Sequence, residues 1–442
     1  MTVQILLPRW IIPVIPRHTV YTDYALVIQG EKIIALQARA DALAAYPDAE
    51  IIKLPDHALM PGMINLHAHS AMTLLRGFAD DLPLMRWLNE HIWPAEGQHV
   101  SDDFVFAGTK LAIAEMIAGG TTCCNDMYFH HGAVARAALD TDFRMTVGCS
   151  ILEFPTPYAS NADDYIRKAL ACRDEFLGEE LVQFTLAPHA PYTVSDQTFS
   201  RIITLADELE LGIHCHIHES ADEIAGSLKE YGVRPLERLA TLGLLDSPLI
   251  AAHMVHTTDS EIALLAKKGV HIAHNPASNL KLASGIAPIS QQLAAGINVG
   301  IGTDGAASNN KLDLFAEMRL AALLAKGQSA NPEAVPAWQA LEMATLNGAT
   351  ALGLQDKIGS LEVGKQADVL AINLAQAGTQ PCYDPISHLV YAADRTQVSD
   401  VWIAGRAVYR RHEHQSLNLA EVLSTARHWQ HKIEGSIAPQ TN

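Results

Sequence analysis

The stretch GMINLHAH, residues 62–69, is an apolar run that ends in two histidines separated by one residue. Seven further short, largely apolar runs follow it, with polar side chains near or just beyond their carboxyl ends: GTTCCNDM (120–127), RMTVGCSI (144–151), LVQFTLAP (181–188), LGIHCHIH (211–218), PLIAAHMVH (248–256), GVHIAHN (269–275) and INVGIGTD (297–304). Longer helical patterns separate the runs, such as DDFVFAGTKLAIAEMIAG and SDQTFSRIITLADELE. Near-continuous apolar runs are typical of buried parallel strands. The alternation therefore predicts an α/β fold, a (β/α)8 TIM-type barrel.

Both ends of the chain carry short extended segments of a different kind. Residues 1–57 contain YALVIQGEKIIALQA and EIIKLP, and residues 360–442 contain SLEVGKQADVLAIN and VSDVWIAGRAVYR. Chain ends usually lie near one another, so the two halves are expected to pair. We therefore predict a small β-sandwich domain made from residues 1–57 and 360–442, with the barrel spanning residues 58–359.

Composition excludes several classes of partner. The formal net charge of −18, without any run of Lys and Arg, makes nucleic acid an unexpected partner. Six cysteines are scattered without CxxC spacing, which argues against a disulfide framework or a thiolate zinc site and favours a reducing cytoplasm. The opening residues MTVQILLPRWIIPVIPRH are broken by prolines and arginines and predict an edge strand rather than a signal peptide. No apolar run reaches the roughly 20 residues of a membrane helix.

The carboxyl ends of the strands carry the chemistry in barrels of this type. The polar residues at these ends form one candidate group: His67, His69, Asp126, His189, His216, His253, Asn275 and Asp304. Alternation along a strand places the imidazoles of His67 and His69 on one face, where they can chelate a metal. A lone HxH pair is more often two surface or core histidines, so this pattern needs support from elsewhere.

A second alternating set gives that support, because His214, His216 and His218 precede Glu219 at the end of another run. Alternation does not choose among the three histidines. One is expected to bind metal, and the others to be neutral imidazoles that hydrogen-bond backbone carbonyls. Glu219 fits a proton carrier beside the metal, or alternatively an ordinary carboxylate at a helix start.

Two more groups complete the set, His253 in AAHMVH and Asp304 in GTDGAASNN. Asp-Gly is a common turn pair, which is the alternative explanation for Asp304. That explanation loses weight because four strand ends supply suitable ligands at once. Imidazoles with one carboxylate suit zinc or ferrous iron.

Several motifs together resemble the amidohydrolase superfamily: PGMINLHAHSAMTLLRG, LAPHAPYTVS, HCHIHES, AAHMVH, GTDGAASNN and IGSLEVGKQADVLAIN. They are most similar to its 5-methylthioadenosine/S-adenosylhomocysteine deaminase branch. The resemblance extends over the barrel and into the terminal β segments. It implies a metal-dependent hydrolase that deaminates a purine-type ring.

The resemblance also implies roles for individual residues. It makes Glu219 the proton shuttle and places His253 beside the attacking water. Glu96, in WPAE, corresponds to a carboxylate that accepts hydrogen bonds from ribose hydroxyls, and His189, in APHAPY, to a substrate-contacting imidazole. Asp304 is expected to act in catalysis with His253 by stabilising the attacking hydroxide, and Glu219 and Asp304 are expected to contact substrate as well. The implied metal ligands are His67, His69, His216 and Asp304.

A single metal is implied, because two-metal relatives usually carry a bridging Lys or Glu on the fourth strand and LVQFTLAPHAP offers neither. Zinc is expected first, although the ligands also accept iron or manganese. No role is assigned to Asp126, Asn275 or Trp93. The resemblance is compatible with a homo-oligomer, but the sequence does not set the oligomeric state.

The expected substrate is an adenosine-type nucleoside, since Glu96 can accept both vicinal hydroxyls of a ribose. Some members of the branch hold an amino-acid carboxylate with arginines after the third strand, but no Arg stands between Arg144 and Arg167. Apolar side chains there suit a methylthio group, or simply pack the loop: Phe154, Pro155, Pro157 and Tyr158. We therefore expect 5'-methylthioadenosine first, with S-adenosylhomocysteine and adenosine as further substrates.

Other functions use the same fold and metal chemistry. The enzymatic alternatives are deamination of guanine or 8-oxoguanine and hydrolysis of a triazine ring. An alternative of another class is a non-catalytic scaffold. Scaffolds built on this fold typically lack the metal ligands, whereas this chain retains all of those expected and Glu219.

Overall fold

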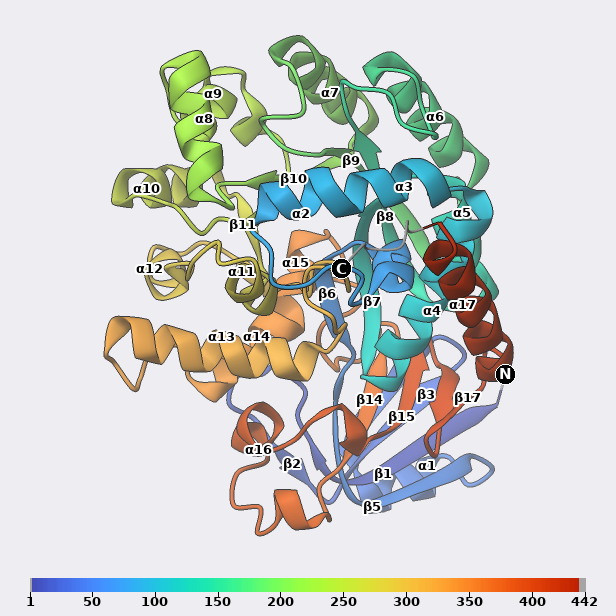
Figure 1. Cartoon of the computed structure of the whole chain (residues 1–442). Coiled ribbons are helices and arrows are strands. Elements are labelled where there is room, and N and C mark those ends of the chain that lie inside the picture. Colours follow the sequence, from blue (N-terminus) through green and yellow to red (C-terminus); the bar gives the residue numbers. More distant parts are fainter. Residues whose placement is uncertain (1, 437–442) are drawn as a thin grey trace.

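Eight parallel strands form the centre of the molecule in the computed structural model, which describes residues 2–436 (Figure 1). They pair in sequence order, and each predicted run coincides with one strand: β6 (Met63–Ala68), β7 (Thr121–Tyr128), β8 (Arg144–Ile151), β9 (Val182–Pro188), β10 (Gly212–Ile217), β11 (Leu249–His253), β12 (His271–His274) and β13 (Val299–Ile301). The predicted (β/α)8 barrel is confirmed.

The barrel closes where the last strand meets the first. The backbone N–H groups of Thr303 and Asp304 both donate to the carbonyl oxygen of His67, at 3.1 and 2.9 Å. This approach is so close that a Cβ atom at Gly302 would lie 2.4 Å from Oδ1 of Asn275 and 2.8 Å from the backbone nitrogen of His67. Only glycine therefore fits at residue 302, and closure brings Asp304 beside His67.

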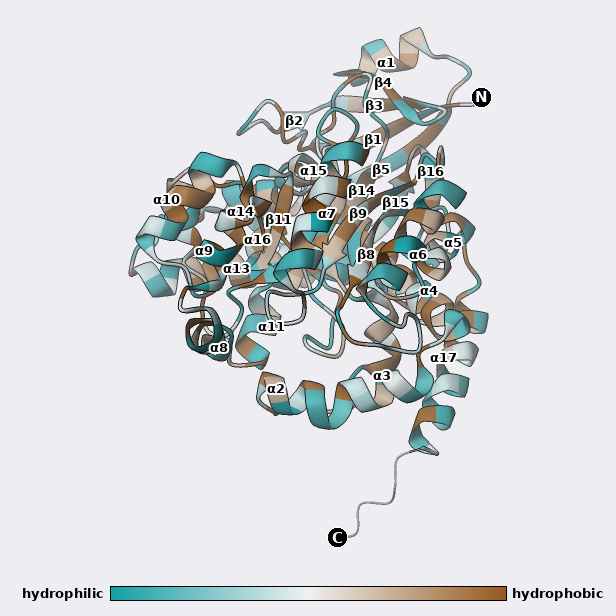
Figure 2. Cartoon of the chain, turned by 90° about the horizontal axis from the view of Figure 1, so that it is seen from above, coloured by the Kyte–Doolittle hydropathy of each residue, from teal (hydrophilic) through white to brown (hydrophobic). Residues whose placement is uncertain are grey.

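Helices surround the strands, and their starts follow from local sequence. Ser101, Asn161 and Ser195 each accept a hydrogen bond from a backbone N–H in the first turn of the helix that follows. The ring comprises α4 (Asp102–Ala118), α5 (His131–Asp140), α6 (Ala162–Glu175), α7 (Asp196–Leu209), α8 (Ala221–Tyr231), α10 (Asp259–Lys268) and α13 (Leu314–Ser329). Figure 2 shows hydrophobic strands at the centre and more hydrophilic helices around them. Among residues 2–436, no helix combines the length and apolar character needed to cross a bilayer.

The two ends of the chain form a second, mixed sheet. In it, β1 (Val3–Ile11) runs parallel to β5 (Glu50–Pro61), and β14 (Val369–Asn373) runs antiparallel to the other edge of β5. The remaining strands are β2 (Tyr21–Thr22), β3 (Tyr24–Gln29), β4 (Lys32–Ala38), β15 (Val398–Ile403), β16 (Arg406–Arg410) and β17 (Glu413–His414). The expected pairing of the two termini is confirmed.

This terminal sheet curls over its own core. Two strands separate β15 from β1, yet Nε1 of Trp402 donates to Oε1 of Gln4 at 3.3 Å. A bridge between Lys32 and Gln366 joins β4 to the segment before β14. Both terminal halves contribute side chains to one buried cluster, including Leu26 and Trp402. The sandwich is thus a single continuous sheet folded over an apolar centre.

A helical segment between β6 and α4 crosses the carboxyl ends of the barrel strands (Figures 1 and 2). It comprises α2 (Leu84–Trp87), η2 (Leu88–Ile92) and α3 (Trp93–His99). Trp87, Leu88 and Ile92 are buried on its inner face. The segment therefore forms a cover over the mouth of the barrel.

The last helix, α17 (Leu419–Glu434), packs on the barrel rather than on the terminal sheet (Figure 1). The ring of Trp429 meets that of Phe104 on α4 edge-on, with ring centroids 5.2 Å apart. The sequence predicts this segment as part of the small β domain. The sequence of an amphipathic helix does not show which surface its apolar face packs on, so the contact with α4 is seen only in the folded structure.

Candidate active site

His67 and His69 both point into the mouth of the barrel from the end of β6. Their Nε2 atoms lie 3.4 and 3.2 Å from Oδ1 of Asp304. His67 is fully buried and His69 is partly buried. The alternation read from the sequence and the closure of the barrel thus place two imidazoles and one carboxylate within 4.8 Å of one another.

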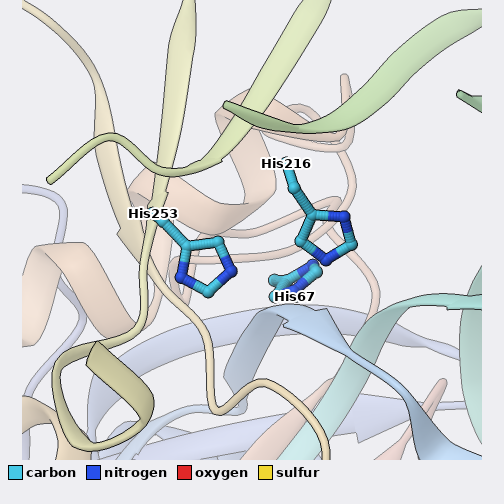
Figure 3. Close-up of side chains that lie close together, drawn as sticks. All are labelled: His67, His216 and His253. Atoms are coloured by element: carbon cyan, nitrogen blue, oxygen red, sulfur yellow. The ribbon is translucent and has the colours of Figure 1, made fainter. Parts of the chain in front are cut away.

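His216, near the end of β10, joins this cluster, since its Nε2 atom lies 3.3 Å from that of His69. His253, the last residue of β11, approaches from the next strand. Figure 3 shows the rings of His67, His216 and His253 converging from three strands, and a ligand nitrogen of each lies within 4.8 Å of the others. Four strand ends therefore supply one cluster of nitrogen and carboxylate donors.

In His69 and His216, the hydrogen bond made by Nδ1, the ring nitrogen that points away from the cluster, determines whether Nε2, the nitrogen that faces the cluster, can bind a metal. Nδ1 of His69 lies 2.6 Å from the carbonyl oxygen of Met127, and Nδ1 of His216 lies 2.7 Å from that of His189. A carbonyl only accepts, so both Nδ1 atoms carry a proton, and the Nε2 atoms are the positions at which these rings can offer a lone pair to a metal. Metal-binding histidines typically have this arrangement.

The inner nitrogen of His67 is buried and has no hydrogen-bond partner among the described residues. Its pKa is lowered to about 4, chiefly by burial, so the ring is neutral near pH 7. A neutral imidazole with an unpartnered nitrogen facing two further imidazoles and a carboxylate fits a divalent transition metal.

The structure separates the three histidines that the sequence could not rank. His214 lies behind His67, with its Nε2 atom 2.9 Å from Nδ1 of that ring. His218 falls beyond the end of β10 with a left-handed φ of 56°, and its Nε2 accepts from the backbone N–H of Leu236 at 3.1 Å. Only His216 reaches the donor cluster.

Glu219 follows β10 and is 6% exposed. Its Oε2 atom lies 3.9 Å from Nε2 of His253. Burial raises the pKa of Glu219, although His253 opposes the shift. A carboxylate that holds a proton more readily than usual, next to a donor cluster, suits proton transfer.

Hydrogen bonds to residues outside the donor cluster hold the side chains of Asp304 and His253 in place. Oδ2 of Asp304 accepts from the hydroxyl of Ser278 at 2.6 Å, and Oδ1 accepts from the backbone N–H of Gly305 at 2.7 Å. Nδ1 of His253 lies 2.8 Å from Oδ1 of Asn279. Strand patterns alone do not point to Ser278 or Asn279, because both residues lie on α11 (Pro276–Lys281), outside the strand runs.

A cavity opens above the cluster, and residues of the cover line it as well. Glu219, His189 and Glu96 all line it. None of its lining residues in the described part of the chain is Lys or Arg. Its apolar wall consists of Leu84, Trp87, Leu88, Ile92 and Trp93 from the cover and Phe129, Leu152 and Phe154 from the strand ends.

Glu96 and His189 face this cavity from opposite structural elements. Oε1 of Glu96, on α3, accepts from the hydroxyl of Tyr128 at 2.6 Å, and burial raises the pKa of Glu96 to about 7. Nδ1 of His189 lies 3.0 Å from Oγ1 of Thr193. The pKa of His189 is lowered to about 3 by burial and by the neighbouring His69, so this ring is neutral.

The three residues without an assigned role lie in different places. Asp126 is buried and accepts from the backbone N–H of Ser70 at 2.6 Å, which fixes the chain just after His69. Asn275 is fully buried at the start of α11 and does not line the cavity. Trp93 lines the cavity, with its ring centroid 5.9 Å from that of Phe154.

The apolar loop after β8 contributes less to the cavity than its composition suggests. Phe154 lines it, whereas Pro155, Pro157 and Tyr158 do not. Tyr158 packs instead on His130, with ring centroids 4.7 Å apart. Of the two explanations for this loop, substrate contact therefore fits Phe154 alone, and packing fits Tyr158.

The chain is similar to a known family and to several named proteins over nearly its whole length. The profile of the amidohydrolase family matches residues 58–408. A protein of Teredinibacter turnerae, named 5-methylthioadenosine/S-adenosylhomocysteine deaminase, is 46% identical over 424 residues, or 96% of either chain. A protein of the same name from Saccharophagus degradans is 46% identical over 430 residues, 97% of this chain and 96% of the relative.

Solved structures show the same architecture. The crystal structure of an adenosine deaminase from Xanthomonas campestris with bound zinc has a TM-score of 0.96 and 46% identity, covering 98% of both chains. A triazine hydrolase variant, at 24% identity and a TM-score of 0.91, covers 97% of this chain and 100% of its own. At this identity the likeness shows the fold alone.

Proposed function

This chain belongs to the amidohydrolase family, and from that premise we propose that it deaminates adenosine-type nucleosides, with 5'-methylthioadenosine as its preferred substrate. It is a hydrolase that acts on carbon–nitrogen bonds. One observation carries the proposal: His69, His216 and Asp304 of the donor cluster, the buried Glu219 and the carboxylate of Glu96 line a single cavity with no Lys or Arg among its described lining residues.

One divalent metal, which we propose to be zinc, would be held by His67, His69, His216 and Asp304. The zinc-bound relative at 46% identity supports this choice. The sequence of β9, VQFTLAP, has neither Lys nor Glu to bridge a second metal. When bound, such a metal lowers the pKa of a coordinated water to about 7 and so makes a nucleophile available at neutral pH.

Glu219 moves the protons of the reaction. Its carboxylate accepts a proton from the water that attacks the amine-bearing ring carbon, and delivers it to the adjacent ring nitrogen. It then takes the remaining proton from the hydroxyl group added to the ring carbon and passes it to the leaving amine. The carbon–nitrogen bond breaks, and ammonia departs as the ring carbonyl forms. The raised pKa of Glu219 suits a group that must both take and give a proton.

His253 and Asp304 orient the attacking water. The bond between Nδ1 of His253 and Oδ1 of Asn279 fixes the ring, so that Nε2 faces Glu219. Ser278 and Gly305 hold the carboxylate of Asp304 in place. These contacts set the geometry before substrate arrives, which removes reorganisation from the reaction.

The substrate end of the cavity supports a nucleoside. We assign Glu96 to the ribose, because its carboxylate can accept hydrogen bonds from two vicinal hydroxyls. We assign His189 to the purine, because its neutral ring faces the cavity 4.8 Å from the ring of His216, measured between centroids. Trp93 and Phe154 add an apolar wall beside Glu96.

The lining of the cavity favours a methylthio group over an amino-acid tail. S-adenosylhomocysteine carries an ammonium and a carboxylate on its 5' substituent. Burying charged groups without partners is costly, and no Lys or Arg lines the described cavity. A methylthio group is apolar and loses nothing on entering a wall of aromatic and aliphatic side chains.

Comparing kcat/KM for 5'-methylthioadenosine and S-adenosylhomocysteine, with adenosine as the sulfur-free reference, tests this proposal. We expect 5'-methylthioadenosine to be favoured by at least about tenfold, equivalent to about 1.4 kcal/mol of transition-state preference. A tenfold preference for S-adenosylhomocysteine would contradict the argument from the lining while leaving the deamination chemistry intact.

A further inference from the structure

Tyr128 links the barrel to the cover through the carboxylate that we assign to the ribose. It is the last residue of β7, it is 4% exposed, and its hydroxyl donates to Oε1 of Glu96 at 2.6 Å. This is the only hydrogen bond to the Glu96 side chain within residues 2–436. The two residues are 32 positions apart in sequence and lie on different structural elements.

We propose that Tyr128 positions Glu96 for ribose recognition, an inference that rests on the proposed function. With Oε1 engaged by the phenol, the carboxylate of Glu96 is held in one orientation. Its second oxygen has no protein partner among the described residues, and the side chain lines the cavity. That oxygen is therefore free to accept from the sugar.

The distance indicates the nature of this bond. Hydrogen bonds from a hydroxyl to an ionised carboxylate are typically 2.5–2.7 Å long, shorter than those between neutral groups. The Tyr128–Glu96 distance of 2.6 Å falls in this range. The geometry thus fits an ionised Glu96, which is the form that can accept two ribose hydroxyls.

A phenol is well suited to this position because it orients the carboxylate without neutralising it. An Arg or Lys at residue 128 would form an ion pair and compete with the sugar for the negative charge. Burial raises the pKa of Tyr128 well above its ordinary value, with a further contribution from Glu96, so the hydroxyl remains a donor. The charge of Glu96 stays available to the substrate.

A purely structural role is the alternative, since the same bond ties α3 to the barrel. The two roles differ in what they do to substrates that lack the ribose hydroxyls. A positioning role affects only a sugar that bonds to Glu96, whereas a loosened cover affects every substrate. Adenosine and 2',3'-dideoxyadenosine differ only in these hydroxyls and therefore separate the two.

The experiment measures KM and kcat for both nucleosides with zinc-loaded wild type and Tyr128→Phe. We expect the variant to raise KM for adenosine about tenfold, to leave kcat within about twofold, and to leave KM for 2',3'-dideoxyadenosine unchanged. The matched control is Tyr165→Phe, because that buried tyrosine bonds Thr156 and does not line the cavity. Neither nucleoside should distinguish this control from wild type.

A second measurement uses the Glu96→Ala background. There, adding Tyr128→Phe should change KM for adenosine by less than about twofold, because the tyrosine has lost the group through which it acts. An equal rise of KM for both nucleosides, or a full tenfold effect in the absence of Glu96, would overturn the proposal. If wild type itself does not prefer adenosine over the dideoxy analogue, the assignment of Glu96 to the ribose is wrong, and the positioning role of Tyr128 is wrong for the same reason.

Discussion

Glu219 is the residue on which the proposed proton transfers depend, and it lies buried beside His253, two residues after the end of β10. Replacing Glu219 by Gln keeps its shape and removes its capacity to carry a proton. We expect kcat to fall about 10²- to 10⁴-fold, because general acid–base catalysis contributes on this scale. Metal content, determined on the purified protein, should stay the same since Glu219 is not among the proposed ligands.

The control for this substitution is Glu237→Gln on α9 (Pro235–Thr241), where the side chain is exposed. It should behave as wild type. Full turnover by a metal-loaded Glu219→Gln protein would remove Glu219 from the mechanism.

The protonation state of Glu96 should make substrate binding, measured as KM, depend on pH. Burial raises its pKa to about 7, while the bond from Tyr128 opposes that rise. The carboxylate is therefore ionised above about pH 7 and becomes protonated as the pH falls through this value. A protonated Glu96 is a poorer acceptor, so KM for adenosine should rise as the pH is lowered below about 7.

Measuring KM between about pH 5.5 and 8.5, with 2',3'-dideoxyadenosine as the reference substrate, checks this expectation. The dideoxy analogue should show a flatter profile because it makes no bond to Glu96. The same acid limb for both nucleosides would assign the titration to another group.

At this scale, the sequence predicted the groups that come together but not how they are held. Strand alternation and strand ends were enough to bring His67, His69 and Asp304 into one group. They could not choose His216 over His218, because the choice depends on the left-handed turn of the backbone at His218. Nor could they pair Tyr128 with Glu96, since only the folded cover brings these residues together. The catalytic and ligand roles of the group stay predictions.

The strands were the most predictable elements of the structure. Parallel strands buried on both faces require continuous apolar runs, and each of the eight runs coincides with a strand. The cover over residues 84–99 and the position of α17 were not predicted. Both depend on which surface an amphipathic helix meets, and local sequence does not contain that information.

The junction of β13 with β6 allows a direct test at the level of the element. In Gly302→Ala, the new Cβ would lie 2.4 Å from Asn275 Oδ1 and 2.8 Å from the backbone nitrogen of His67, so the strands must separate. We expect a loss of about 1–3 kcal/mol in the free energy of unfolding, the typical cost of overpacking. Metal affinity should fall too, because His67 moves.

Gly327→Ala is the matched control, since a Cβ at this position in α13 meets nothing within 4 Å. Alanine favours helix, so this variant should be as stable as wild type or up to about 1 kcal/mol more stable. Thermal unfolding and metal titration of both variants provide the comparison. Equal stability of the two variants would mean that β13 and β6 tolerate separation.

Over the whole molecule, a buried ion pair joins the barrel to the terminal sheet. Arg144 lies at the start of β8, and Asp368 lies just before β14. Nε and Nη2 of Arg144 donate to the carboxylate of Asp368 at 2.9 and 3.0 Å. Asp368 also accepts from the backbone N–H of Ala404 at 2.7 Å. Both charged side chains are at most 4% exposed. The pair holds together segments more than 200 residues apart in sequence.

Replacing Asp368 by Ala would leave the Arg144 guanidinium buried without its partner. We expect a loss of about 3–5 kcal/mol, the usual result of breaking a buried pair from one side. The exposed pair of Arg406 and Asp142 is the reference, because its loss in Arg406→Ala should cost no more than about 1 kcal/mol. Urea unfolding of both variants tests the difference, and similar losses would show that burial adds nothing to the first pair.

At this scale the sequence predicted that the two termini pair, because extended segments occur at both ends of the chain. It did not predict that the terminal sheet curls until Trp402 reaches Gln4, since curvature arises from packing of the whole sheet. The domain boundaries stay predictions.

The central claim is that this family member deaminates an adenosine-type nucleoside in a cavity whose described lining has no Lys or Arg. Its most direct test is ammonia release by the zinc-loaded protein from 5'-methylthioadenosine, adenosine, S-adenosylhomocysteine and guanine, compared as kcat/KM. We predict the highest value for 5'-methylthioadenosine and a measurable one for adenosine, with one ammonia released per nucleoside consumed. Activity confined to guanine would contradict the assignment of Glu96 to a ribose and, with it, the proposed substrate.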